Sequence, residues 1–172
     1  GLSRSKLQAR RRRLAAADEL SRMEPATVVS LRLHILGSDV FRVTAAIGTL
    51  PRGTRLALDV SGTRLHLAGL ESVLGALTAA RTQLVALSLR STGIDESCAP
   101  LLGRLVAAHA PTLAALDLSR NAALADSSAL ALASTLSRAV FDTSPPALRS
   151  LDLRSCGISL AGALALAELL RA

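Results

Sequence analysis

Residues 148–170, LRSLDLRSCGISLAGALALAELL, contain the pattern that decides the fold. Five residues fill the frame L-x-x-L-x-L-x-x-N/C-x-L, namely Leu148, Leu151, Leu153, Cys156 and Ile158. The alternating leucines indicate a short strand that buries one face, and the apolar spacing of the residues after Ile158 indicates a helix. The stretch therefore predicts one strand-and-helix unit of a repetitive fold.

The same frame recurs along the chain. Its central strand leucine is found at four positions: Leu58, Leu87, Leu116 and Leu151. The first two intervals are 29 residues each and the third is 35, lengthened at residues 121–124 and by the loop 141–146. Asn121 and Cys156 occupy the N/C position, whereas Thr63 and Thr92 stand there in the earlier repeats. We expect all four side chains to satisfy backbone groups in the turn after the strand, which makes Cys156 a turn residue rather than a nucleophile.

The helical halves share three positions at i, i+4 and i+8, which form one helix face. These are a small position (Gly69, Cys98, Ser128, Gly162) and two apolar ones (Val73, Leu102, Leu132, Leu166 and Leu77, Val106, Leu136, Leu170). With the strand frame, residues 26–172 resemble leucine-rich repeat proteins of the ribonuclease-inhibitor-like subclass, whose helix reads roughly G-D-x-G-A-x-x-L-A-x-x-L. The resemblance implies an α/β solenoid, a short horseshoe arc with parallel strands on the concave side and helices on the convex side.

The predicted domain organisation is a basic, helical arm at residues 1–25 followed by the repeat domain at 26–172. The first repeat, residues 26–53, is atypical: Leu31 and Leu33 indicate a strand, and a short helix after Ser38 and Asp39 ends before Pro51. Terminal repeats of solenoids commonly differ in this way because they cap the core. Four regular repeats follow. The chain has two Phe and no Trp or Tyr, so its core must consist of Leu, Ala and Val.

The arm concentrates the positive charge of the chain. The net charge is +7, and residues 1–25 hold seven basic side chains against three acidic ones. We expect an acidic partner to contact Arg4, Lys6, Arg10, Arg11, Arg12 and Arg13. The planar guanidinium group suits phosphate and carboxylate equally, so RNA and an acidic protein surface both stay open.

Two further interpretations of the arm also stay open. Residues 1–17 are Arg-rich, contain Ser and lack acids, as mitochondrial transit peptides do. If a Met precedes Gly1, the start matches the myristoylation pattern M-G-x-x-x-S, and membrane contact would then follow from lipidation. No apolar run reaches the roughly 18 residues that span a bilayer. The expected location is intracellular, with the mitochondrion as one alternative.

Three surfaces of the repeat domain are candidate protein contacts. The variable strand positions predict a polar concave face of mixed charge with six candidate contacts: Arg32, Asp59, Arg90, Asp117, Asp152 and Arg154. Leu160 and Leu164 lie beside the core face of the last helix, where an open solenoid end needs a cover. Phe141 is an aromatic anchor candidate at the tip of the loop VFDTSPPA.

The sequence offers no sign of catalysis, a cofactor or a metal. It lacks H-E-x-x-H, G-x-x-x-x-G-K, G-x-G-x-x-G and G-x-S-x-G. His34, His66 and His109 fall in different repeats, and the two cysteines have no ligand spacing. The prediction is a non-enzymatic interaction subunit of a larger assembly, binding protein neighbours through the solenoid. The alternatives are an RNA-contacting subunit of a ribonucleoprotein such as a mitochondrial ribosome, using residues 4–13, and a myristoylated adaptor.

Overall fold

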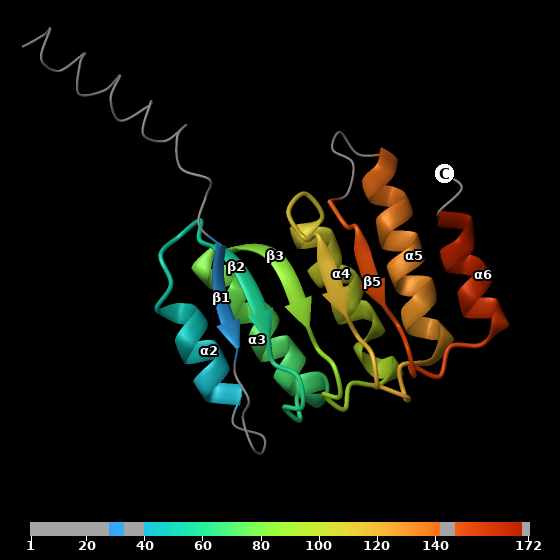
Figure 1. Ribbon diagram of the computed structural model, residues 1–172, viewed down its shortest axis with the longest axis horizontal. Helices are drawn as coiled ribbons and strands as arrows, with labels where there is room; N and C mark the ends of the chain where they lie inside the picture. The colour runs from blue at the N-terminus through green and yellow to red at the C-terminus, as the bar shows by residue number, and fades with distance from the viewer. Residues whose placement is uncertain (1–27, 33–39, 142–146, 170–172) are drawn as a thin grey trace, which may run out of the picture.

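The computed structural model describes residues 28–32, 40–141 and 147–169 of the 172-residue chain. Its core is one parallel sheet of five strands in sequence order (Figure 1). The strands are β1 (Val28–Arg32), β2 (Arg55–Asp59), β3 (Gln83–Ser88), β4 (Ala115–Asp117) and β5 (Ser150–Asp152). The helices are α2 (Val40–Gly48), α3 (His66–Ala80), the 3-10 turn η1 (Glu96–Cys98), α4 (Ala99–His109), α5 (Ala125–Phe141) and α6 (Leu160–Leu169). All the helices lie on one side of the sheet (Figure 1), which confirms the predicted solenoid arc.

Strand pairing confirms the repeat frame. The register aligns Leu31, Leu58, Leu87, Leu116 and Leu151 across the five strands. The three inner leucines of this row are at most 2% exposed. Since side chains alternate along a strand, the residues on either side of each leucine face away from the helices. We call this side of the sheet the strand face.

The shared helical positions form the other half of the core. Val73, Leu102 and Leu132 are fully buried. The small residues Cys98 and Ser128, which stand four residues before Leu102 and Leu132, are fully buried as well. Small side chains at that position let each helix approach its strand closely. The predicted helix face is thus the buried face.

A ladder of polar contacts ties the turns together. The Asn121 amide donates to the carbonyl oxygens of Leu89 and Leu118, both at 2.8 Å, and its Oδ1 accepts from the amides of Thr92 and Gly93 at 2.9 and 3.0 Å. The Cys156 thiol donates to the Leu118 carbonyl at 3.1 Å. This confirms the predicted turn role of both residues.

The two threonines at the same position behave differently. The Thr92 hydroxyl donates to the Leu89 carbonyl at 2.7 Å, as expected. The Thr63 hydroxyl is buried and has no hydrogen-bond partner among the described residues, so the expectation was wrong for Thr63. A threonine side chain is shorter than that of asparagine and carries one polar atom. Its hydroxyl can therefore bond only to a carbonyl that lies very close, as the Leu89 carbonyl does for Thr92.

Candidate protein-interaction surface on the strand face

A row of small side chains runs across the strand face. Directly before each central leucine stands Ser or Ala, and the strand register aligns them: Ser30, Ala57, Ala86, Ala115 and Ser150. With neighbouring residues they line a hollow of about 410 Å³. We call these five residues the small row. Since no side chain in it projects far, a partner can approach the backbone of the sheet closely.

Charged and hydroxyl side chains form a second row beside the small row. It consists of Arg32, Asp59, Ser88, Asp117 and Asp152, aligned by the same register and lining the same hollow. We call these the polar row. It recurs because each strand repeats one frame, in which every second side chain faces the same side.

The polar row is joined by contacts between strands. Arg32 pairs with Asp59 at 3.0 Å, and the Ser61 hydroxyl, which donates to Asp59 at 2.6 Å, lies 2.8 Å from the Ser88 hydroxyl. Ser88 in turn donates to Asp117 at 3.2 Å. These hydrogen bonds hold the carboxylates of β2 and β4 in defined positions, which preorganises the face for binding.

The carboxylates differ in how their charge is compensated. Asp152 makes a bidentate ion pair with Arg154, which lowers the Asp152 pKa from 3.8 to about 2. Asp117 accepts hydrogen bonds from the Ser88 hydroxyl and the Ser119 amide, and among the described residues it has no ion-pair partner. Asp117 therefore offers a fixed negative charge near the middle of the strand face to a basic partner group.

The structure places all six predicted concave residues on or at the margin of this face. Arg32, Asp59, Asp117 and Asp152 line the hollow. Arg90 and Arg154 stand two residues beyond the polar row, where Arg90 donates to the Ser119 hydroxyl at 3.3 Å. His34, at the same position in the first repeat, lies outside the described residues. The small row was missed in the sequence, although a small residue before each central leucine was its readable signal.

The two predicted end-cap leucines lie in different environments. Leu160 is 76% exposed and Leu164 is 55% exposed. Leu164 corresponds to Leu130 in α5, itself 52% exposed, so this position faces outward in both helices. Leu160 corresponds to Asp126, whose carboxylate accepts a 2.7 Å hydrogen bond from the Ser159 amide of the next repeat. Leu160 thus occupies the helix position that, in α5, contacts the next repeat, whereas Leu164 occupies one that faces outward.

The remaining predicted contacts cannot be placed in the same way. Phe141 is the last residue of α5 rather than the tip of a loop, because the helix continues through residues 137–141. Its side chain lies outside the described part of the chain, and so do the arm residues 4–13 and Gly1.

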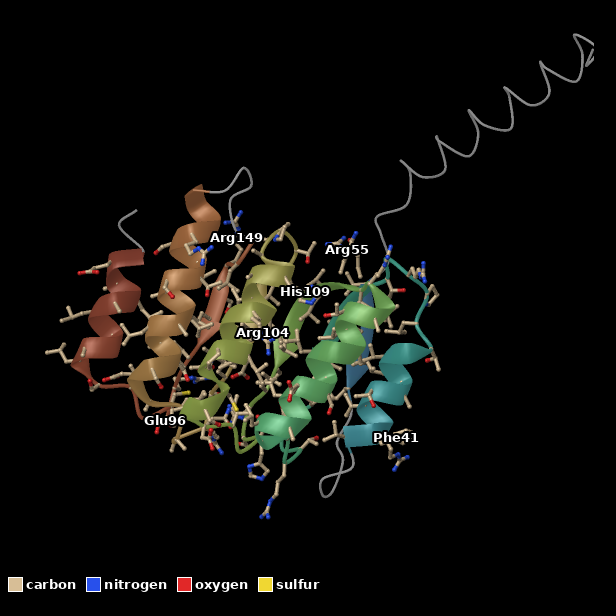
Figure 2. All side chains as sticks on the ribbon, turned by 180° about the vertical axis from the view of Figure 1, so that it is seen from behind. Phe41, Arg55, Glu96, Arg104, His109 and Arg149 are labelled. Carbon is tan, nitrogen blue, oxygen red and sulfur yellow. The ribbon has the colours of Figure 1, made fainter. Side chains whose placement is uncertain are left out.

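A second hollow of about 540 Å³ lies on the helix side, between α3 and α4. Glu71, Leu74, Gly75 and Thr78 of α3 line it opposite Arg104 and Ala108 of α4. In Figure 2, which shows the molecule from this side, Arg104 and His109 both lie on the side of α4 toward α3. His109 is 7% exposed, its Nε2 atom has no hydrogen-bond partner among described residues, and burial lowers its pKa.

The chemistry-bearing groups of the described residues do not assemble into a reactive centre. No three His, Cys, Asp or Glu side chains within residues 28–32, 40–141 and 147–169 are grouped to hold a metal ion. Cys98 and Cys156 are buried free thiols, and burial raises the pKa of each, which disfavours the nucleophilic thiolate. Among the described helices none is long and apolar enough to cross a bilayer.

Comparison with known families supports the repeat assignment. Residues 109–133 and 145–167 match the family model described as Leucine Rich repeat. The search of curated proteins returned no match to the chain. The two matched segments contain β4, β5, about half of α5 and most of α6, so the family model and the geometry support a leucine-rich repeat protein. Neither comparison bears on the ribonuclease-inhibitor-like subclass, which stays a prediction.

Proposed function

We propose that this protein is a non-enzymatic interaction subunit of a larger assembly and that its strand face binds a protein partner. The small row is the observation that carries the proposal. Five small side chains in register leave the middle of the face open across all five strands, and the polar row lies directly beside it. Leucine-rich repeats, which two segments of the chain match, support a role in protein interaction.

The charges of the face favour a partner segment that presents a basic side chain. Arg32 and Arg154 already neutralise Asp59 and Asp152, so the carboxylate of Asp117 is available for a new ion pair. The neighbouring hydrogen bonds hold it in place, which lowers the entropic cost of binding. Apolar parts of the partner would pack on Ala57, Ala86 and Ala115.

A steric substitution tests this proposal. Replacing Ala86 by Arg in the full-length chain fills the centre of the small row with a long side chain, whereas Ala79→Arg adds the same side chain at an exposed position of α3 on the helix side. We expect proteins that copurify with the wild type to be retained by Ala79→Arg and lost by Ala86→Arg. Asp117→Asn should weaken the same interactions at least tenfold, the value of one charged contact of about 1.4 kcal/mol.

Equal binding by the two arginine variants would overturn the proposal. If Ala86→Arg and Ala79→Arg retain the same proteins while both variants melt within a few degrees of the wild type, the strand face is not the binding surface. RNA contact through residues 4–13 and lipidation of Gly1 remain predictions from the sequence.

A further inference from the structure

Arginines gather at the edge of the fold where the strands begin and the helices end. Arg52 and Arg55 precede or open β2, Arg81 caps the end of α3, Arg138 lies in the last turn of α5, and Arg149 precedes β5. We call these five the basic edge. Figure 2 shows Arg55 and Arg149 at this edge and Glu96 and Phe41 at the opposite one.

Acidic side chains are nearly absent from the basic edge within the described ranges. Asp59, Asp117 and Asp152 belong to the strand face, and Glu71 lies in the first half of α3, away from its C-terminal end. Asp95, Glu96 and Asp126 lie at the opposite edge, which leaves Glu168 near the end of α6 as the one described carboxylate on this side. Arg52, Arg81, Arg138 and Arg149 make no ion pair among the described residues.

The fold itself brings these arginines together. The Gly53 amide donates to the Arg81 carbonyl at 3.1 Å, which sets Arg52 beside Arg81 although they are 29 residues apart. The Arg149 amide donates to the Ala114 carbonyl at 2.8 Å and so fixes the start of β5 against β4. Neighbouring strands are about 4.8 Å apart, so the basic edge from β2 to β5 extends over roughly 14 Å.

Helix ends reduce this positive charge without cancelling it. Each helix C-terminus contributes roughly half a negative charge, and α2, α3, α4, α5 and α6 all end here. Their sum of about −2.5 is smaller than the four positive charges of Arg52, Arg81, Arg138 and Arg149. The chain also enters β1 at this edge, because Val28 pairs with Arg55, so the basic residues 1–27 connect to the fold here.

We propose that the basic edge binds the phosphate backbone of a duplex nucleic acid without reading its sequence. A duplex carries about one charge per 1.7 Å of axis, so 14 Å of edge faces roughly eight phosphate charges. The proposal concerns a surface distinct from the strand face and does not depend on what the strand face binds.

The surface chemistry favours nucleic acid over an acidic protein. Protein interfaces need an apolar or aromatic core, whereas nucleic-acid interfaces are polar and strongly positive. The exposed residues around Arg52, Arg81 and Arg149 are Pro, Gly, Gln and Ser, and of the exposed large apolar residues of the described chain Val28 and Val29 alone come near this edge. Of the two aromatic residues in the sequence, Phe41 lies at the opposite edge and Phe141 ends α5 at this one, so the basic edge has no row of aromatic side chains of the kind on which single-strand binding relies.

Fluorescence anisotropy with a labelled 20-base-pair duplex, measured across a salt series, tests the inference on the full-length protein. The edge variant carries Arg52→Gln, Arg81→Gln and Arg149→Gln. The control carries Arg64→Gln, Arg104→Gln and Arg120→Gln, three exposed arginines away from the edge, and so has the same net charge. Each lost phosphate contact lowers the slope of log K against log salt by about 0.9.

We expect the edge variant to lose about 2 to 3 units of that slope and roughly 10- to 100-fold in affinity at 100 mM salt, with the control close to the wild type. Equal losses in both variants would show a response to net charge alone and would overturn the proposal. It would also fail if a polyglutamate peptide bound more tightly than the duplex, or if the edge variant kept the full slope while Arg10→Gln, Arg11→Gln, Arg12→Gln and Arg13→Gln together removed it. Thermal melting of both triple variants establishes that each is folded.

Discussion

The side-chain amide of Asn121 donates a 2.8 Å hydrogen bond to the carbonyl oxygen of Leu89, which belongs to the preceding repeat. The same side chain accepts from two amides of that repeat, those of Thr92 and Gly93, and donates to Leu118 in its own repeat. One buried residue therefore satisfies four backbone groups and fastens two turns to each other. The repeats are held together by this contact as well as by their leucines.

Removal of that contact should be costly. Asn121→Ala leaves the buried Thr92 amide and the part-buried Gly93 amide without this partner, and each unsatisfied group costs about 1 to 3 kcal/mol. The carbonyls of Leu89 and Leu118 keep the Thr92 hydroxyl and the Cys156 thiol as donors. We expect a loss of about 2 kcal/mol or more in the free energy of unfolding, measured by urea denaturation. A loss below about 1 kcal/mol would show that water or neighbouring residues replace the side chain.

The two threonines at the same turn position should respond in opposite ways. Thr92→Val removes a 2.7 Å hydrogen bond to Leu89 and should cost about 1 kcal/mol. Thr63→Val replaces a buried hydroxyl that has no partner among the described residues with a methyl group of similar size, so its stability should stay equal or rise. Urea midpoints of both variants measure the difference, and an equal loss in both would contradict it.

Gly157 should tolerate no side chain. Its φ is +67°, and a Cβ there would overlap the carbonyl oxygen of Ala122. Gly53 is a matched control, because its φ is +77° and a Cβ would meet nothing within 4 Å. Gly53→Ala should cost about 1 kcal/mol for the left-handed backbone alone, and Gly157→Ala about 2 kcal/mol more for the overlap. Thermal melting of the two variants would contradict this account if their midpoints fell equally.

The buried imidazole of His109 should make stability depend on pH. Burial lowers its pKa below the usual value of about 6.5, so the unfolded chain binds the proton more tightly than the folded protein does. The free energy of unfolding therefore falls as the pH drops below about 6.5, by at most about 1.4 kcal/mol per pH unit.

Urea titrations between pH 8 and 5.5 measure this effect. His109→Leu should flatten the dependence, whereas Leu113→Ala, which truncates a buried side chain in the turn after His109, should lower stability by a similar amount at every pH. A wild-type slope that persists in His109→Leu would assign the dependence to other groups.

Local sequence signals predicted the fold because they act within one repeat. The alternation around Leu151 and the spacing of Leu132 and Leu136 each follow from side chains that meet the same core, and the structure confirms them. The exception at Phe141 has a local cause as well. The segment SRAVF continues the helix through Phe141, so the predicted loop began too early in the chain.

Features that arise between repeats were harder to predict. The basic edge contains Arg52, Arg81 and Arg149, which are 29 and 68 residues apart in sequence and lie along one edge because the strands pair in sequence order. The different surroundings of Leu160 and Leu164 depend on which neighbour each position faces, and a single repeat does not show that. The identity of the strand-face partner depends on the partner's own surface, which this sequence does not contain.

Site-directed cross-linking tests the central claim, protein binding at the strand face, most directly. The photoreactive residue p-benzoylphenylalanine would replace Ala86 in the small row or, as the control, Ala79 on the helix side, in the full-length protein within the cells that make it. We predict that position 86 forms cross-links to a protein neighbour and that position 79 does not. Cross-links at position 79 with none at position 86 would contradict the account and move the binding surface to the helices.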